Sequence, residues 1–169
     1  ERRLDFTSEV GRDFALFQKA KLRIGYADYE HAEVEPNGEI GTLFSNQGWE
    51  GRLELVDKTS SLLGGDLNGA LGVQWQLRDY SAIGEEAFVP PTTSSQYGVF
   101  AIKELTQGPW RFELGGRYER TQHEVEGTTT ERSFDGFSVS GGVGLKPAEN
   151  LFFGATGFRT ERAPSIEEL

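Results

Sequence analysis

The chain has 169 residues, enough for one domain, with no Cys and a formal net charge of −10. Lack of Cys excludes disulfides and thiolate metal sites, and the acidic balance argues against nucleic acid as a partner, because phosphates require a basic surface. No apolar run approaches the roughly 20 residues of a membrane helix, which excludes helical membrane proteins but not β-barrels. The chain starts at Glu1 with no initiator Met or signal peptide, so we expect a mature or internal piece.

In chain order, the sequence predicts about eight strands and no helix. Abundant Gly and the aromatic and β-branched residues oppose helix formation. The predicted strands are Arg2–Val10, Gln18–Glu33, Thr42–Val56, Asp66–Ser81, Ser95–Thr106, Pro109–Glu124, Phe134–Leu145 and Asn150–Thr160. Several of them are much longer than the roughly six residues usual in a soluble β-sandwich.

These strands alternate between apolar and polar residues, which is the period of an extended strand with two different faces. The apolar set comprises Leu71, Val73, Trp75, Leu77, Trp110, Phe112, Leu114 and Tyr118. The opposite set comprises Arg23, Arg52, Glu54, Arg111, Glu113, Arg117 and Glu119. In an outer-membrane barrel the first set would face lipid and the second a wet lumen, where cross-strand neighbours of opposite sign would meet. In a soluble barrel the apolar set would instead fill the core.

The connections between the predicted strands alternate between two kinds. Compact turns lie near Thr106–Pro109 and Lys146–Asn150, whereas longer polar connections lie at Glu35–Gly41, Ala82–Ser94 and Val125–Ser133. Short turns at one end and long loops at the other are typical of a transmembrane barrel. The sequence therefore predicts an all-β, antiparallel up-and-down meander that forms part of such a barrel.

Two groups of polar residues are candidate metal ligands. His31, Glu33 and Glu35 have the spacing that places alternate side chains on one face of a strand, and imidazole with carboxylates suits Zn²⁺ or another divalent ion. His123 lies beside two further Glu residues at the end of another predicted strand, and the topology would bring both groups to the same end of the sheet. The alternative is two solvated strand ends. No grouping of nucleophile, base and oxyanion donor indicates an enzyme.

Three stretches resemble one known family. The terminal segment begins with Arg162-Ala163-Pro164 and ends with Glu168-Leu169, with three residues between them. It resembles the R-A-P-x-x-x-E-L segment of TonB-dependent outer-membrane receptors. Gly25–His31 and Gln76–Pro91 also resemble segments of that family. The resemblance extends over nearly the whole chain and is greatest to receptors for iron complexes and to a branch associated with zinc or haem.

The resemblance implies that residues 1–169 are one segment of a receptor barrel that has about 22 strands in the family, without the plug domain. It implies active uptake of a scarce metal complex (siderophore-iron, haem or zinc) across the Gram-negative outer membrane. The partners would be membrane lipid, the metal-complex ligand and TonB, the last through regions outside this chain, with no bound cofactor. Within the terminal motif, we expect Arg162 to pair with a carboxylate of a neighbouring strand and Pro164 to end the strand pairing. Two alternatives remain open at this point: a complete eight-stranded outer-membrane barrel with a structural or passive-channel role, and a soluble β-barrel binding protein.

Overall fold

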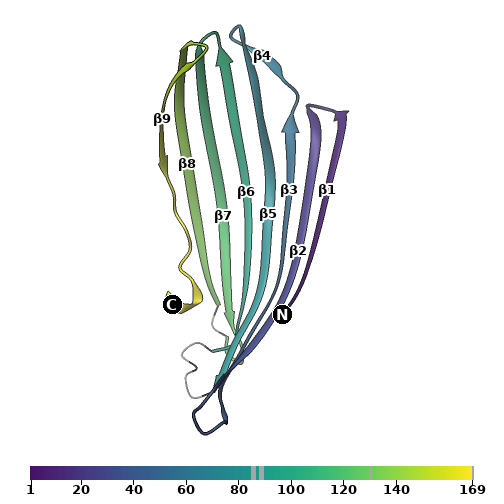
Figure 1. Ribbon diagram of the computed structural model, residues 1–169, viewed down its shortest axis with the longest axis vertical. Helices are drawn as coiled ribbons and strands as arrows, with labels where there is room; N and C mark the ends of the chain where they lie inside the picture. Colours follow the sequence, from purple (N-terminus) through teal and green to yellow (C-terminus); the bar gives the residue numbers. More distant parts are fainter. Residues whose placement is uncertain (85–86, 88–89, 130, 169) are drawn as a thin grey trace.

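The structure, a computed structural model, describes residues 1–84, 87, 90–129 and 131–168. Within this part of the chain, nine strands form one sheet, and a single 3₁₀ turn follows the last of them (Figure 1). The elements are β1 (Arg2–Phe14), β2 (Phe17–Val34), β3 (Ile40–Asp57), β4 (Ser60–Leu62), β5 (Gly65–Gly84), β6 (Thr92–Gln107), β7 (Trp110–Val125), β8 (Glu131–Ala148), β9 (Leu151–Arg159) and η1 (Ile166–Glu168). The described residues contain no helix that is both long and apolar enough to cross a membrane.

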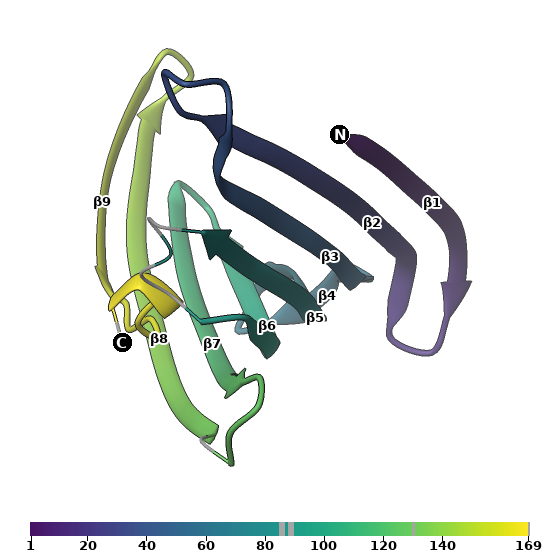
Figure 2. The same cartoon turned by 90° about the horizontal axis from the view of Figure 1, so that it is seen from below.

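The sheet is an antiparallel up-and-down meander, as predicted. Its strand order is β1-β2-β3-β5-β6-β7-β8-β9, and β4 pairs only with the beginning of β5. Figure 2 shows that the sheet curves strongly from one edge to the other. Its two edge strands are β1 and β9, and no pairing between them closes the described sheet.

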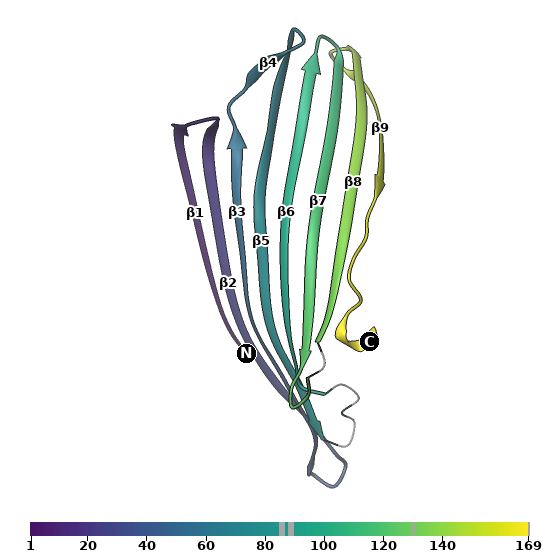
Figure 3. The same ribbon diagram turned by 180° about the vertical axis from the view of Figure 1, so that it is seen from behind.

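The connections alternate in length, as the sequence predicts. Short links join β1 to β2, β6 to β7 and β8 to β9 at one end of the sheet, here called the short-turn end (Figure 3). Longer links join β2 to β3, β5 to β6 and β7 to β8 at the opposite end, here called the long-connection end. In the short links, Ala15 and Gly108 adopt positive φ angles of 47° and 57°, which reverse the chain within two residues.

The observed strands differ from the predicted ones in number and length. The sequence predicts about eight strands, and the described part of the chain has nine. The additional strand is β4, whose three residues carry no readable periodicity. Strand β6 begins three residues earlier than predicted, at Thr92, and β8 extends from Glu131 to Ala148 rather than from Phe134 to Leu145. These extra residues are mostly polar or small, so they resemble loop sequence, although residues 92–94 and 131–133 are paired in the ladder.

The sheet has one face that is mainly apolar and one that is mainly polar. Val73, Val99 and Tyr118 are cross-strand partners on the first, here called the apolar face. Arg52, Gln74 and Glu119 belong to one cross-strand row on the second, here called the polar face. Among the described residues, the buried hydrophobic side chains are limited to Ala82 and Ile166. The sheet therefore encloses no apolar core of its own.

Candidate functional site

The pairing register places all seven predicted lumen residues on the polar face. Arg23 lies opposite Arg52, which lies opposite Gln74, and the same row continues through Gly98 to Glu119. The side chains of cross-strand partners project to the same side of a sheet. Glu54 and Arg117 belong to the adjacent row, and Arg111 and Glu113 follow along β7 at the same two-residue spacing.

Charges on the polar face follow the expected pairing of opposite signs in part. Direct cross-strand partners include two pairs of like charge, Arg23 with Arg52 and Glu104 with Glu113. Arg111 lies within reach of both carboxylates of the second pair, and its Nη2 atom is 2.6 Å from Glu104 Oε2 and 2.6 Å from Glu113 Oε1. Opposite charges meet directly across the strands at Lys21 and Glu54, and diagonally or along a strand at Arg111.

A second group of charges lies on β2 and β3. Glu54 accepts hydrogen bonds from Lys21 Nζ at 3.2 Å and from Arg52 Nη2 at 3.0 Å. The guanidinium of Arg52 also lies 4.1 Å from the ring centroid of Phe100, a cation–π distance. On β7, Arg117 donates to Glu119, and the Gln96 amide donates to the same carboxylate. The polar face thus carries a connected set of charged groups suited to contact with water and polar solutes.

The chain continues beyond β9 as residues 161–168, here called the C-terminal strap (Figure 1). Residues 162–166 of the strap lie over polar-face residues of β5, β6 and β7, with which they line a cavity. The backbone N–H of Glu161 donates to Ser138 Oγ at 3.3 Å, and its side chain accepts from the backbone N–H of Phe137 at 3.2 Å. Ile166, in η1, is 8% exposed. These contacts fix the strap to β8 and return the chain toward the sheet.

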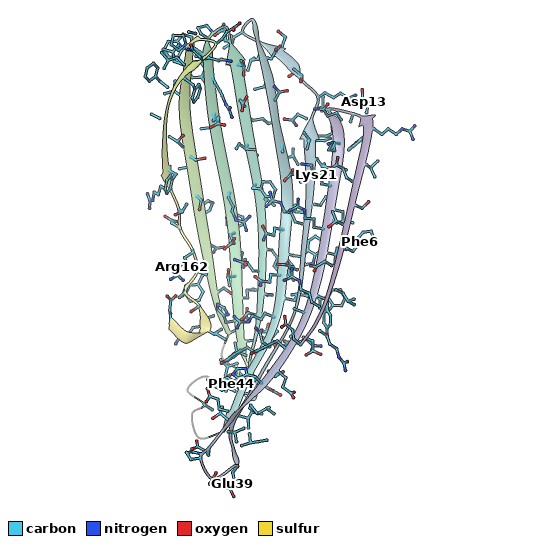
Figure 4. The ribbon with its side chains drawn as sticks, viewed as in Figure 1. Phe6, Asp13, Lys21, Glu39, Phe44 and Arg162 are labelled. Carbon is cyan, nitrogen blue, oxygen red and sulfur yellow. The ribbon has the colours of Figure 1, made fainter. Side chains whose placement is uncertain are left out.

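The predicted family motif forms a clasp within the strap. Arg162 donates to Glu168 through Nη1 at 2.8 Å and Nη2 at 2.7 Å, and the Ser165 backbone N–H donates to Glu168 at 2.8 Å. These hydrogen bonds lower the pKa of Glu168 from 4.5 to about 2, and the bond from Arg162 has the largest effect. The expectation that Arg162 pairs with a neighbouring strand was wrong, because a bidentate partner is available six residues along the chain. Figure 4 shows Arg162 beside η1; Leu169 lies outside the described residues.

His123 connects the strap to the sheet. Its side chain is 6% exposed, its Nδ1 atom is 2.8 Å from Ser94 Oγ, and its Nε2 atom is 3.3 Å from the Pro164 carbonyl oxygen. Both ring nitrogens therefore have hydrogen-bond partners. Ala163 and Pro164 lie in the loop that the clasp closes, and Pro164 makes the contact with His123, so the motif serves to shape the strap over the polar face.

The predicted metal ligands are not brought together. In the described part of the chain, no three His, Asp or Glu side chains are grouped closely enough to hold a metal ion. His31 stacks on Phe44 with ring centroids 4.6 Å apart, and the Glu35 backbone closes a turn with Gly38 and Glu39. His31 lies on β2 and His123 on β7, with three strands between them, so about 19 Å of sheet separates the two strands. A metal site shared by the two groups would have to bridge that distance.

The apolar face carries all eight predicted apolar residues, and it extends further than predicted. Leu114 is 69% exposed, Phe112 42% and Val73 41%, while Trp75 is half-buried because its ring covers Gly51. Trp110 and Phe112 stack with centroids 6.2 Å apart. The remaining predicted members also lie on this face: Leu71, Leu77 and Tyr118. Exposed hydrophobic residues of β1 that the prediction did not single out are Leu4 and Phe6. Exposed residues of β6 and β8 also lie on this face, namely Val99, Phe137 and Val139.

One ion pair on the apolar face was missed by the sequence reasoning. The Lys103 ammonium binds the Asp57 carboxylate above Gly69, close to the short-turn end of the sheet. The alternation of β3 could have indicated it, since Asp57 is two residues beyond Leu55 and shares its face. The pair marks where the apolar surface gives way to polar groups at that end.

Long antiparallel strands with one apolar and one polar face, joined by alternating short and long connections, define the wall of a β-barrel. A family model described as TonB dependent receptor-like, beta-barrel matches residues 2–169. The chain therefore belongs to the β-barrel family of TonB-dependent receptors, which are outer-membrane transporters. A search of curated proteins finds no match to the chain.

Proposed function

We propose that this chain forms part of the barrel wall of an outer-membrane active transporter that takes up a scarce metal complex with energy delivered through TonB. The metal complex is a siderophore-iron complex, haem or zinc. The observation that carries the proposal is the exposed apolar face. Charged residues lie on the opposite face of the sheet from β1 to β7.

The apolar face is the surface that contacts lipid in this proposal. Side chains such as Leu114 and Phe137, 69% and 60% exposed, would be unfavourable in water, whereas hydrocarbon accommodates them. Trp110 and Tyr118, eight residues apart on β7, span roughly 20 Å of membrane thickness at a strand tilt of about 40°. A soluble barrel is disfavoured because it would need these residues in a packed interior.

The polar face lines the lumen in the same proposal. Many of its charges are bonded to one another, as in the Arg111 and Glu54 groups, which suits a surface in contact with water or a polar solute. The unpaired edges of β1 and β9 would pair with further strands of the same barrel, because hydrocarbon leaves no other partner for their backbone groups. A complete eight-stranded barrel would instead require β1 to pair with β9.

Uptake measurements test the proposal. The gene for the full-length protein is deleted in its host, and accumulation of labelled siderophore-iron, haem and zinc is measured under metal limitation, with and without functional TonB. We expect accumulation of one of these to fall in the deletion strain and to return on complementation only when TonB is active. Accumulation that is unchanged by the deletion, or restored equally without TonB, would contradict the proposal.

A further inference from the structure

A cavity of about 260 Å³ lies between the polar face and the C-terminal strap. Its floor is formed by side chains of β5, β6 and β7, and its cover by strap residues 162–166. The volume is roughly nine times the share of one water molecule in the liquid, and it is slightly below the range usual for drug-sized ligands. The cavity can therefore hold a small molecule, or one arm of a larger one.

Thr121 is the first sign that this cavity is built for a ligand. Its side chain lines the cavity and is 7% exposed, and its Oγ1 atom has no hydrogen-bond partner among the described residues. A buried hydroxyl without a hydrogen-bond partner destabilises a folded protein. Natural structures keep few such groups, so an unpaired hydroxyl at a cavity wall indicates a partner that enters the cavity.

Arg78 supplies a positive charge at the wall of the cavity. Its Nε atom donates to Asn46 Oδ1 at 2.8 Å and its guanidinium lies 5.2 Å from the ring centroid of Tyr80, but it forms no ion pair with a described carboxylate. The other charged groups of the lining are already paired: Glu119 with Arg117, and Arg162 with Glu168. The cavity therefore has one cation whose charge is not balanced within the described part of the chain.

We infer that the cavity binds the carboxylate group of a small organic ligand. A guanidinium presents two parallel N–H donors that match the two oxygens of a carboxylate, and the Thr121 hydroxyl adds a third donor. Gln76, also in the lining, provides amide N–H donors, while Ala163, Pro164 and Ile166 cover the hydrocarbon part of the ligand. This inference rests on the proposed function in one respect, namely that the polar face is the side on which solutes arrive.

Binding to the purified full-length protein in detergent tests the inference without requiring uptake or TonB. The probes are succinate and its neutral analogue succinamide, compared by isothermal titration calorimetry. We expect saturable succinate binding with a Kd at least tenfold lower than that for succinamide. Absence of saturable succinate binding, or equal affinity for the two probes, would overturn the inference. Succinate would also fail to bind if an acidic side chain of another segment of the protein already occupied the cavity, and the inference would then be wrong as well.

Two variants assign the binding to the named groups. Thr121→Val keeps the shape of the side chain and removes only a hydroxyl that has no partner, so we expect an unchanged melting temperature and about fivefold weaker succinate binding. Arg78→Gln should weaken it at least tenfold. The matched controls, Thr156→Val on β9 and Arg111→Gln on β7, change polar-face residues outside the cavity lining and should leave the affinity unchanged.

The outcomes separate this inference from the proposed function. If Thr121→Val binds succinate as the wild type does, the carboxylate site is wrong even where TonB-dependent uptake persists. If the variants weaken succinate binding as predicted but no metal complex is taken up, the proposed function is wrong and the carboxylate site is still supported.

Discussion

Large side chains lie over glycines of neighbouring strands on both faces of the sheet. On the apolar face the Trp75 ring covers Gly51, and a Cβ atom at Gly51 would lie 1.9 Å from Trp75 Cζ2. On the polar face Phe100 covers Gly72 in the same way, at 2.6 Å. Glycine is required at these positions because an aromatic ring occupies the space of its missing side chain, and the contact shields backbone that a glycine leaves open.

We therefore predict that Gly51→Ala destabilises the protein by about 1–3 kcal/mol, because the Trp75 ring must leave its position over the strand. Urea unfolding of the full-length protein in detergent, followed by tryptophan fluorescence, measures the change. Gly116→Ala is the matched control, since a Cβ atom there meets nothing within 4 Å and it also lies in a strand on the apolar face. Equal stability of the two variants would show that Trp75 does not need the space above Gly51.

At the scale of elements, the C-terminal strap depends on contacts that are distant in sequence. His123 and Pro164 are 41 residues apart, and Glu161 meets Ser138 and Phe137 on another strand. The clasp between Arg162 and Glu168, in contrast, is local and lies outside the strands. The strap is thus an internally fixed turn that is attached to the sheet at its two flanks.

The clasp predicts a defined pH dependence. Because the pKa of Glu168 is about 2 in the folded chain, below its ordinary value of 4.5, the contact contributes stability at every pH above about 4.5. That contribution falls as the pH drops below 4.5 and is lost once the pH passes below about 2. Carboxyl ¹³C NMR of the full-length protein should show Glu168 titrating near pH 2. An Arg162→Gln variant should return the pKa toward 4.5; a Glu168 pKa near 4.5 in the wild type would contradict the clasp.

The same elements indicate how much could be predicted from sequence. Strand β7 was predictable almost to the residue, because Trp110, Phe112 and Leu114 alternate with charged residues and a strand has a period of two. Strand β4 was not, because three residues show no period. The place of His123 was not predictable either: its proximity to two glutamates suggested a metal ligand, whereas its actual partners come from β6 and from the strap. The alternation of residues within a strand determines which face of the sheet a side chain occupies. It does not determine which residues of a distant segment will contact that side chain.

At the scale of the whole molecule, the sheet is open and has no packed interior of its own. Two edges, β1 and β9, present backbone groups that no described strand pairs. In hydrocarbon such groups must find partners, so this sheet needs more strands to form a stable transmembrane wall.

We predict that residues 1–169 expressed alone and refolded in detergent form no compact monomer, whereas the full-length protein does. Electrophoresis with and without heating measures this, because a closed barrel migrates faster before heating than after it. The isolated chain should migrate identically in both lanes or appear as oligomers joined at their edges. A heat-modifiable monomer of the isolated chain would mean that β1 and β9 can close a small barrel by themselves.

The most direct test of the central claim asks which face of β7 meets lipid. Residues 1–169 contain no Cys, so in a full-length protein without other Cys residues, single cysteines placed along residues 112–118 can each carry one nitroxide spin label. Collision rates with lipid-soluble oxygen and a water-soluble nickel chelate are then measured in bilayers. We predict that Phe112, Leu114 and Tyr118 favour oxygen while Glu113 and Arg117 favour the chelate, with opposite phase and a period of two. Higher chelate accessibility at Phe112, Leu114 and Tyr118 than at the charged positions would contradict the account.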